Sequence, residues 1–140
     1  MKDKLNPFHL AIPVSNLEES VAYYRDTLGL REGRSSNKWA DFDFFGHQLV
    51  CHVSDSINEQ ITNAVDGEEV PVPHFGVVLS IEEFEEFLSQ INDKNVDFII
   101  KPTIRFKGEI GEQRTMFFKD PSGNAIEIKA FKDMNNLFSS

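Results

Sequence analysis

Short apolar runs along the chain predict strands, and two of these runs lead directly into helical patterns. The segments 9–14 and 73–79 are apolar and rich in β-branched residues, which is typical of buried strands. After each comes a serine with an acid three residues later, a capping-box pattern, and then an apolar stripe with helical spacing. We therefore expect helices that begin after Ser15 and Ser80. Further strands are predicted at 31–35, 39–45, 48–54, 97–101, 115–119 and 125–130.

The two strand–helix patterns belong to an internal repeat, in which His9 and Ser15 match His74 and Ser80 at a constant offset of 65 positions. Each copy reads βαβββ. The sequence therefore predicts an α+β fold in which two βαβββ modules form a cup-shaped mixed sheet with helices on its convex face. We expect one domain over 1–140, made of module one (6–54), a polar acidic connection (55–72), module two (73–131) and a tail (132–140).

Strand alternation places the candidate chemistry on one face of this sheet. Successive side chains of a strand point to opposite faces, and the bulky apolar face should contact the helices. The opposite face then carries His9, His74 and Glu127, and the strand 48–54 adds Gln48 and His52. Two imidazoles and a carboxylate form the facial triad of non-haem Fe(II) sites, and the same donors accept Mn²⁺, Zn²⁺, Ni²⁺ or Co²⁺. A lone strand histidine is more often structural, but two at matched positions of a repeat predict a divalent-metal site.

Composition and charge limit the class of protein and its possible partners. The chain has 140 residues, of which 40% are hydrophobic and 26% charged, as in ordinary soluble domains. Its single cysteine, Cys51, excludes an intrachain disulfide and a CxxC-type zinc site. No apolar run reaches the ~18–20 residues of a membrane span, so we expect no membrane partner and a cytoplasmic protein. The net charge of −9 argues against nucleic acid, which requires a basic face.

The end of the second module carries a family resemblance. The run 117–127, with the letters FFKDPSGNAIE, resembles the ending of the vicinal oxygen chelate superfamily. That superfamily includes glyoxalase I, fosfomycin- and bleomycin-resistance proteins, methylmalonyl-CoA epimerase and extradiol dioxygenases. The segments 44–48, 71–76 and 105–108 resemble a small single-domain group of predicted extradiol-type dioxygenases. The resemblance implies His9, His74 and Glu127 as metal ligands, Fe(II) as the favoured ion, and dioxygenase-like activity on a small molecule with vicinal oxygens.

Two departures from the family pattern keep other activities open. Ring-cleavage members typically have a tyrosine ten residues before the last glutamate and a histidine further upstream, where this chain has Phe117 and about Gly108. Glyoxalase-type members often take a fourth ligand, usually a glutamate, from the strand equivalent to 48–54, which has no acid here. The alternatives are a non-oxidative lyase or isomerase of glyoxalase or epimerase type, and a metal-free small-ligand-binding protein of resistance type.

Further candidates surround the predicted metal. His52 and His47 are candidate general bases, although His47 after Gly46 also suits a turn cap. Arg105 is a candidate catalytic residue for an anionic group, on a loop at 103–113 that we expect to move, although a solvated surface cation fits equally. The candidate substrate-binding residues are Gln48, Phe45, Lys107 and Phe117. The substrate would be an aromatic diol or an anionic small molecule. The resemblance implies that two modules pair to close a cup, either within one chain or between chains, and we predict a homodimer.

Overall fold

The computed structural model describes residues 5–56, 61–65 and 67–139. The chain divides into two compact units, 1–57 and 58–140, and each contains one four-stranded sheet with a helix on one face. The predicted α+β fold built on a repeated βαβββ module is confirmed.

The first unit contains one copy of the module. Its elements are β1 (His9–Val14), α1 (Leu17–Ala22), the π-helical turn η1 (Tyr23–Thr27), β2 (Arg31–Ser35), β3 (Trp39–Phe44) and β4 (His47–Val53). The strand order is β1-β4-β3-β2, with β1 parallel to β4 and the other pairs antiparallel.

The second unit repeats this order after a two-stranded hairpin. The hairpin is formed by β5 (Ile61–Val65) and β6 (Glu68–Val72). The module that follows contains β7 (Phe75–Leu79), α2 (Ile81–Ile91), β8 (Asp97–Arg105), β9 (Gln113–Lys119) and β10 (Ala125–Phe131), and a 3-10 turn, η2 (Met134–Asn136), comes after it. The strand order β7-β10-β9-β8 matches that of the first unit.

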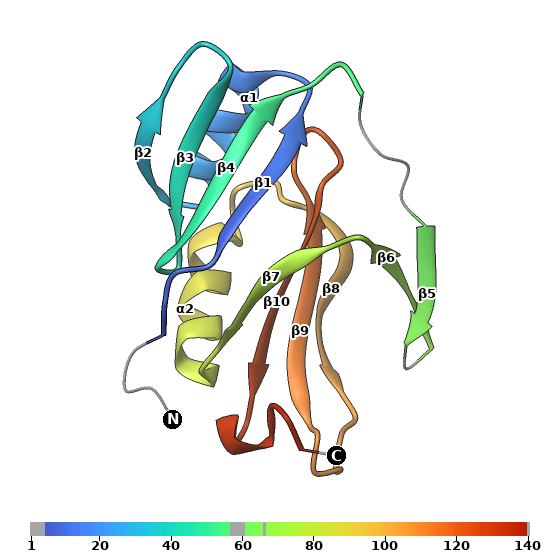
Figure 1. The fold of residues 1–140 in the computed structure, drawn as a ribbon. Coiled ribbons are helices and arrows are strands. Elements are labelled where there is room, and N and C mark those ends of the chain that lie inside the picture. The colour runs from blue at the N-terminus through green and yellow to red at the C-terminus, as the bar shows by residue number, and fades with distance from the viewer. Residues whose placement is uncertain (1–4, 57–60, 66, 140) are drawn as a thin grey trace. The chain divides into compact units, whose positions relative to one another are not determined.

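In the second unit, α2 covers one face of the sheet (Figure 1). Ser80 and Glu83 form the predicted capping box at its start. The helix buries Phe84, Phe87 and Ile91, and the ring of Phe87 stacks on that of Phe118 with centroids 6.3 Å apart. The helix therefore covers the apolar face of β9 and β10, and the alternate residues of these strands, Glu127 among them, face the other way.

The first helix differs in one detail from the sequence prediction. Its N-cap is Asn16, whose side chain accepts a hydrogen bond from the backbone N–H of Glu19, so the expected cap at Ser15 is wrong by one residue. Asparagine and serine are comparable N-caps, so the sequence alone does not choose between neighbours. The helical segment packs the buried ring of Tyr24 against Phe42 of β3, with centroids 5.5 Å apart.

Two segments expected to be irregular are partly strands. Within the connection 55–72, β5 and β6 pair as a hairpin, in which all five residues of β5 are exposed. The strand predicted at 97–101 continues to Arg105, because Thr103 pairs with Thr115 and Arg105 with Gln113. The expected loop at 103–113 is therefore shorter and lies between β8 and β9, at 106–112.

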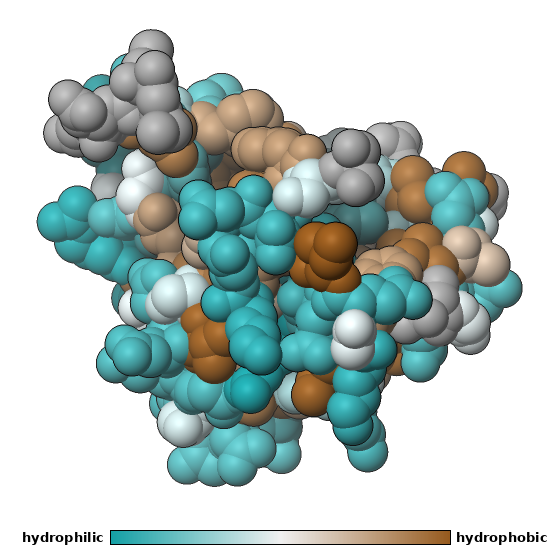
Figure 2. Space-filling model, turned by 90° about the horizontal axis from the view of Figure 1, so that it is seen from below, coloured by the Kyte–Doolittle hydropathy of each residue, from teal (hydrophilic) through white to brown (hydrophobic). Residues whose placement is uncertain are grey.

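Hydrophilic residues cover most of the face that Figure 2 shows. The longer of the two α-helices in the described segments, α2, has 11 residues, about half of what a bilayer crossing takes, so no described helix could span a membrane.

Candidate metal centre

A close approach of two strands places His74 beside Glu127. His74 precedes β7, which runs parallel to β10 with Gly76 opposite Glu127. A Cβ added at Gly76 would lie 1.5 Å from the backbone oxygen of Glu127, so only glycine permits this spacing. The Nε2 atom of His74 lies 3.4 Å from Oε1 of Glu127.

The other ring nitrogen of His74 is already held. Its Nδ1 lies 2.7 Å from the backbone oxygen of Pro71. A carbonyl oxygen only accepts hydrogen bonds, so Nδ1 carries the proton and the neutral ring presents the lone pair of Nε2. The ring of Phe117 packs edge-to-face against the imidazole at 4.9 Å between centroids and fixes its plane.

Glu127 is the buried member of the pair, with 8% of its surface exposed. The hydroxyl of Thr115 donates to Oε2 at 2.5 Å, which leaves Oε1 on the side of His74. Burial acts to raise the pKa of Glu127, but the hydrogen bonds from His74 and Thr115 outweigh it and the pKa is lowered. The hydrogen bond with Glu127 raises the pKa of His74 despite partial burial. Both shifts favour an ion pair when no cation is bound.

His9 has an equivalent arrangement in the first unit. Its Nδ1 lies 2.7 Å from Oε1 of Gln48, the residue opposite it in the β1–β4 register. The amide nitrogen of Gln48 donates to Oδ2 of Asp41 at 3.1 Å, so the amide oxygen faces His9. Nδ1 of His9 therefore donates, and its Nε2 also carries the lone pair. In both modules an oxygen acceptor selects the same tautomer.

The turn between β9 and β10 positions Glu127. Asp120 is buried, and its Oδ1 accepts from the backbone N–H groups of Ser122 and Asn124 at 2.9 and 2.8 Å. Gly123 takes a left-handed φ of 87° that suits glycine. The Asp-Pro-Ser-Gly-Asn run is thus a hydrogen-bonded turn, and it sets the register that places Glu127 opposite Phe117.

Comparisons with known proteins identify the family. A family model described as the Glyoxalase/Bleomycin resistance protein/Dioxygenase superfamily matches residues 6–128. The chain belongs to this superfamily. Its relatives include a protein named metallothiol transferase FosB from Staphylococcus saprophyticus, 25% identical over 120 residues, which are 86% of this chain and 73% of that protein. Membership supports a metal-dependent enzyme that acts on a small molecule.

Solved structures of the superfamily share the fold. A glyoxalase/bleomycin resistance protein/dioxygenase from Alicyclobacillus acidocaldarius is 31% identical, with a TM-score of 0.84 over 99% of this chain and 100% of that one. The fosfomycin resistance protein FosX from Listeria monocytogenes is 22% identical, with a TM-score of 0.66 over 93% and 94% of the two chains, and shows the fold alone.

The structure brings together two of the three predicted metal ligands of this superfamily member. His74 and Glu127 meet in the second unit, and His9 belongs to the first. Among the described residues, no three histidine, cysteine, aspartate or glutamate side chains form a metal-binding group by themselves. The convergence of all three ligands on one ion stays a prediction.

The two further histidines have different surroundings. Nδ1 of His47 accepts a hydrogen bond from the backbone N–H of Phe8 at 2.8 Å, which fastens the segment before β1 to the start of β4. This contact favours the structural role for His47. His52 is exposed on β4 between Pro13 and Trp39. Its role as a general base stays a prediction.

The predicted substrate-binding residues are distributed over both units. Gln48 lines a depression of about 290 Å³ in the first unit, together with Gly33 and Asp41. Phe45 lies in the β3–β4 turn with a φ of 51°. Lys107 is exposed in the loop 106–112, and Phe117 is 1% exposed beneath His74.

Arg105 differs from its expected surroundings. It ends β8 and is 4% exposed, so the expectation of a loop position and the alternative of a solvated surface cation are both wrong. Its Nη1 donates to the backbone oxygen of Val65 in β5 at 2.9 Å, so the β5–β6 hairpin contacts the guanidinium. The hairpin was not foreseen, and without it nothing in the sequence indicated burial.

Three residues of the site were missed by sequence reasoning. Thr115 holds Glu127, Pro71 holds His74, and Asp41 holds Gln48. Alternation gives a signal for two of them, because Thr115 shares a face with Phe117, and Asp41 lies on the polar face of β3. Pro71 contributes a backbone atom, which no side-chain pattern reveals.

Proposed function

We propose that this protein is a metal-dependent enzyme in which His9, His74 and Glu127 hold one divalent cation. The observation that carries the proposal is the matched anchoring of the two histidines. Each Nδ1–H donates to an oxygen, at 2.7 Å in both cases, and each Nε2 is left as the ligand atom. Metal-binding histidines generally have such an oxygen partner on the second nitrogen, because it fixes the tautomer and the ring orientation.

The donor set fits a divalent cation. Neutral imidazole nitrogens and a carboxylate oxygen suit Mn²⁺, Fe(II), Co²⁺, Ni²⁺ and Zn²⁺. Thr115 holds one oxygen of Glu127, and the other faces His74. When bound, the cation would supply Lewis acidity to an oxygen of the small molecule. Phe117, buried against the ring of His74, excludes water from that side. The preference for Fe(II) stays a prediction.

A non-oxidative addition fits the neighbouring residues best. Phe117 has no hydroxyl with which to donate or accept a proton, and the hydroxyl of Thr115 already donates to Glu127. The relatives named metallothiol transferases point to a thiol as the attacking group. The chain's own Cys51 is 0% exposed, so the thiol would come from a second small molecule. Its sulfur would form a bond to an electrophilic carbon of an epoxide as the carbon–oxygen bond breaks, and the oxygen would take up the proton that the thiol gives up.

The test is product formation with a defined pair of substrates. The protein is loaded with Mn²⁺, Zn²⁺, Ni²⁺ or Co²⁺ and incubated with fosfomycin, an epoxide, and cysteine. Mass spectrometry should detect the thiol adduct with at least one metal. The variants His74→Gln and Glu127→Gln should abolish it. Adduct formation at the background rate with every metal would overturn the transfer reaction, while metal retention would be judged separately.

An extradiol-type dioxygenase is the second candidate. The two-histidine, one-carboxylate set is also that of Fe(II) oxygenases, which leave coordination positions open. Anaerobically purified, Fe(II)-loaded protein should then consume O₂ with a catechol, an aromatic diol. No uptake across a catechol panel would reject this reaction. We also propose a homodimer, which a monomer mass by light scattering at micromolar concentration would contradict.

A further inference from the structure

A buried guanidinium in the second unit has hydrogen-bonding capacity that no described residue fills. Arg105 is 4% exposed, and its Nη1 donates to Val65 O at 2.9 Å. Its Nε and Nη2 are buried and have no hydrogen-bond partner in the part of the chain that the structure describes. No carboxylate among those residues forms an ion pair with it.

Such a side chain needs a counter-ion. Guanidinium stays protonated at any pH that a folded protein tolerates, so it cannot relieve burial by losing its proton. An unpaired buried charge is among the most destabilising features that a fold can retain. The two open nitrogens therefore indicate a place for an anion that binds to the folded protein.

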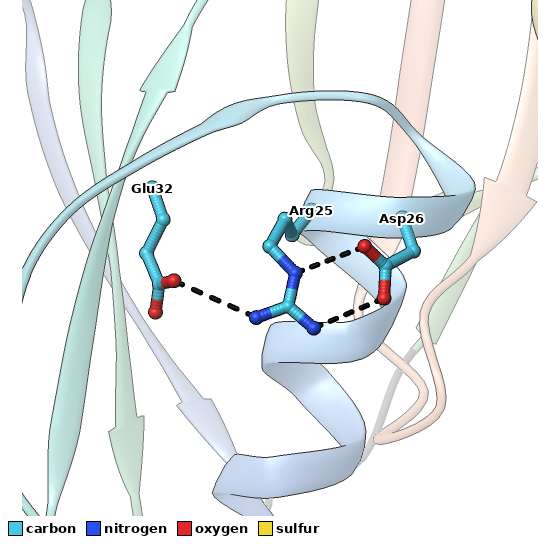
Figure 3. Close-up of polar contacts among 3 residues, drawn as sticks. All are labelled: Arg25, Asp26 and Glu32. Carbon is cyan, nitrogen blue, oxygen red and sulfur yellow. Dashed lines mark hydrogen bonds and ion pairs between the residues drawn. The ribbon is translucent and has the colours of Figure 1, made fainter.

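The open nitrogens lie on one edge of the guanidinium, and this edge suits two oxygens of a single oxyanion. The same chain shows the match on its surface. Nε and Nη2 of Arg25 donate to Oδ1 and Oδ2 of Asp26 at 2.9 and 3.0 Å, and Nη1 faces Glu32 (Figure 3). Arg105 presents the same edge, and no carboxylate of the described segments contacts it.

The sheet register places Arg105 on the face that carries Glu127. Arg105 pairs with Gln113, and Thr103 pairs with Thr115, whose hydroxyl binds Glu127. Paired residues of antiparallel strands share a face, so Arg105 lies one alternation from the Thr103–Thr115 pair, about 7 Å along the strand. Glu127 pairs with Phe117, four residues along β9 from Gln113, so the positions of Arg105 and Glu127 lie about 13 Å apart along the strand direction. An anionic group on Arg105 would therefore lie on the same face of the sheet as Glu127.

We propose that Arg105 binds an oxyanion of the substrate, a carboxylate or a phosphate-type group, through Nε and Nη2. This assignment rests on the proposed function, whose substrate it restricts to small anions. An oxyanion would reach the guanidinium as the end of β5 moves away from it. An isolated two-stranded hairpin is only marginally stable, so a movement of β5 would cost little free energy.

The test uses inorganic phosphate and acetate as separate probes on chelator-treated full-length protein. Melting temperature is followed in each anion against chloride at equal ionic strength. At least one of the two anions should raise the melting temperature, and the increase should level off at high anion concentration. Which anion is active distinguishes a site for a phosphate-type group from a site for a carboxylate. Arg105→Lys keeps the charge but loses the paired donors, and should weaken binding at least tenfold. The matched control Arg25→Lys should bind as the wild type does.

Two further measurements keep the proposal falsifiable. The Nε–H signal of Arg105 is identified in ¹⁵N-labelled protein as the arginine signal that is absent from the Arg105→Lys spectrum. In the wild type this signal should shift on titration with the anion that raises the melting temperature. If Arg105→Lys does not fold, the melting response of the wild type alone decides. Asp66 follows Val65 in the sequence and lies outside the described residues. If neither anion stabilises the wild type but one stabilises Asp66→Asn, the counter-ion is internal and the proposal is overturned.

The test separates this inference from the metal site. Chelated protein and the His74→Gln variant should both keep oxyanion binding, because neither change touches Arg105. The oxyanion site would be overturned if the anions stabilised wild type and Arg105→Lys equally, or if they stabilised neither protein. The metal proposal would still stand. Loss of metal binding with intact oxyanion binding would do the reverse.

Discussion

Nε2 of His74 faces Oε1 of Glu127 at 3.4 Å, while Pro71 and Thr115 hold the other polar atom of each residue. The two facing atoms are those that a cation would take. The ion pair is therefore the arrangement of the cation-free protein, and metal binding must replace it. The preset orientation means that little side-chain reorganisation opposes that exchange.

The ion pair should stabilise the chelator-treated protein in a bounded pH window. The pKa of His74 is raised by its hydrogen bond to Glu127, so its contribution is complete below about 6.5 and is lost as pH rises through the raised value. The pKa of Glu127 is lowered despite burial, so its contribution is present above about 4.5 and is lost as pH falls through the lowered value. The contribution is largest between these limits.

Urea unfolding measures that window. The free-energy difference between wild type and His74→Gln should be about 1 kcal/mol larger at pH 5.5 than at pH 9, the size of a partly exposed ion pair. His52→Gln, which changes an exposed histidine on β4, provides the control and should show no such dependence. A pH-independent difference for His74→Gln would contradict the pairing.

Thr115→Val should weaken metal binding without changing the shape of the side chain. The substitution removes the hydroxyl that donates to Oε2 of Glu127 at 2.5 Å. Loss of an oxygen's orienting partner typically lowers metal affinity by about 10–100-fold. Calorimetric titration with Mn²⁺ measures this loss. Thr103→Val, at the exposed residue paired with Thr115, should bind as the wild type does, and equal affinities for the two variants would refute the role of Thr115.

Gly76→Ala should destabilise the second unit strongly. The new Cβ would lie 1.5 Å from the backbone oxygen of Glu127, and separating β7 from β10 is the only relief. Forced overpacking of this kind costs about 2–3 kcal/mol. Gly111→Ala is the matched control, since a Cβ there has nothing within 4 Å, and it should stay within about 1 kcal/mol of wild type. Similar urea midpoints for both variants would show that the close approach is not required.

Gln48→Met should affect the metal site more than stability. Methionine keeps the length of the side chain but cannot accept from Nδ1 of His9 or donate to Asp41. The ring of His9 then loses its fixed tautomer, and metal affinity should fall by about 10–100-fold. Because Gln48 is exposed, the free energy of unfolding should change by less than about 0.5 kcal/mol. The same substitution at the exposed helix residue Gln90 should leave affinity unchanged, and an unchanged affinity for Gln48→Met would reject the orienting role.

The repeat was readable from sequence because local signals agreed with one another. The capping box at Ser80, the alternation around Glu127 and the Asp-Pro-Ser-Gly turn each predicted an element that the structure contains. The β5–β6 hairpin was missed because β5 is exposed along its whole length and β6 buries only Val70 and Pro71, so neither strand has a strong alternation. The burial of Arg105 depends on that hairpin and could not be seen without it.

For the candidate ligands, the sheet face was predictable from the sequence. Alternation placed His9 and Gln48 on one face, and the register pairs them. It also placed Glu127 on the face away from α2, which contacts Phe118 through Phe87. The atoms that fix the histidine tautomers were beyond reach, because one is the carbonyl oxygen of Pro71 and the other depends on the orientation of an amide. Such contacts depend on distances of a few tenths of an ångström that sequence spacing does not specify.

Metal stoichiometry in single-ligand variants tests the proposed site most directly. Anaerobically purified wild type and the variants His9→Gln, His74→Gln and Glu127→Gln are analysed for bound metal by mass spectrometry, with circular dichroism to confirm the fold. The proposal predicts one divalent ion per chain in the wild type and at least a hundredfold weaker binding in each variant. Full metal retention by folded His9→Gln would contradict a site shared by the two modules, and no retained or titratable metal in the wild type would contradict the site altogether.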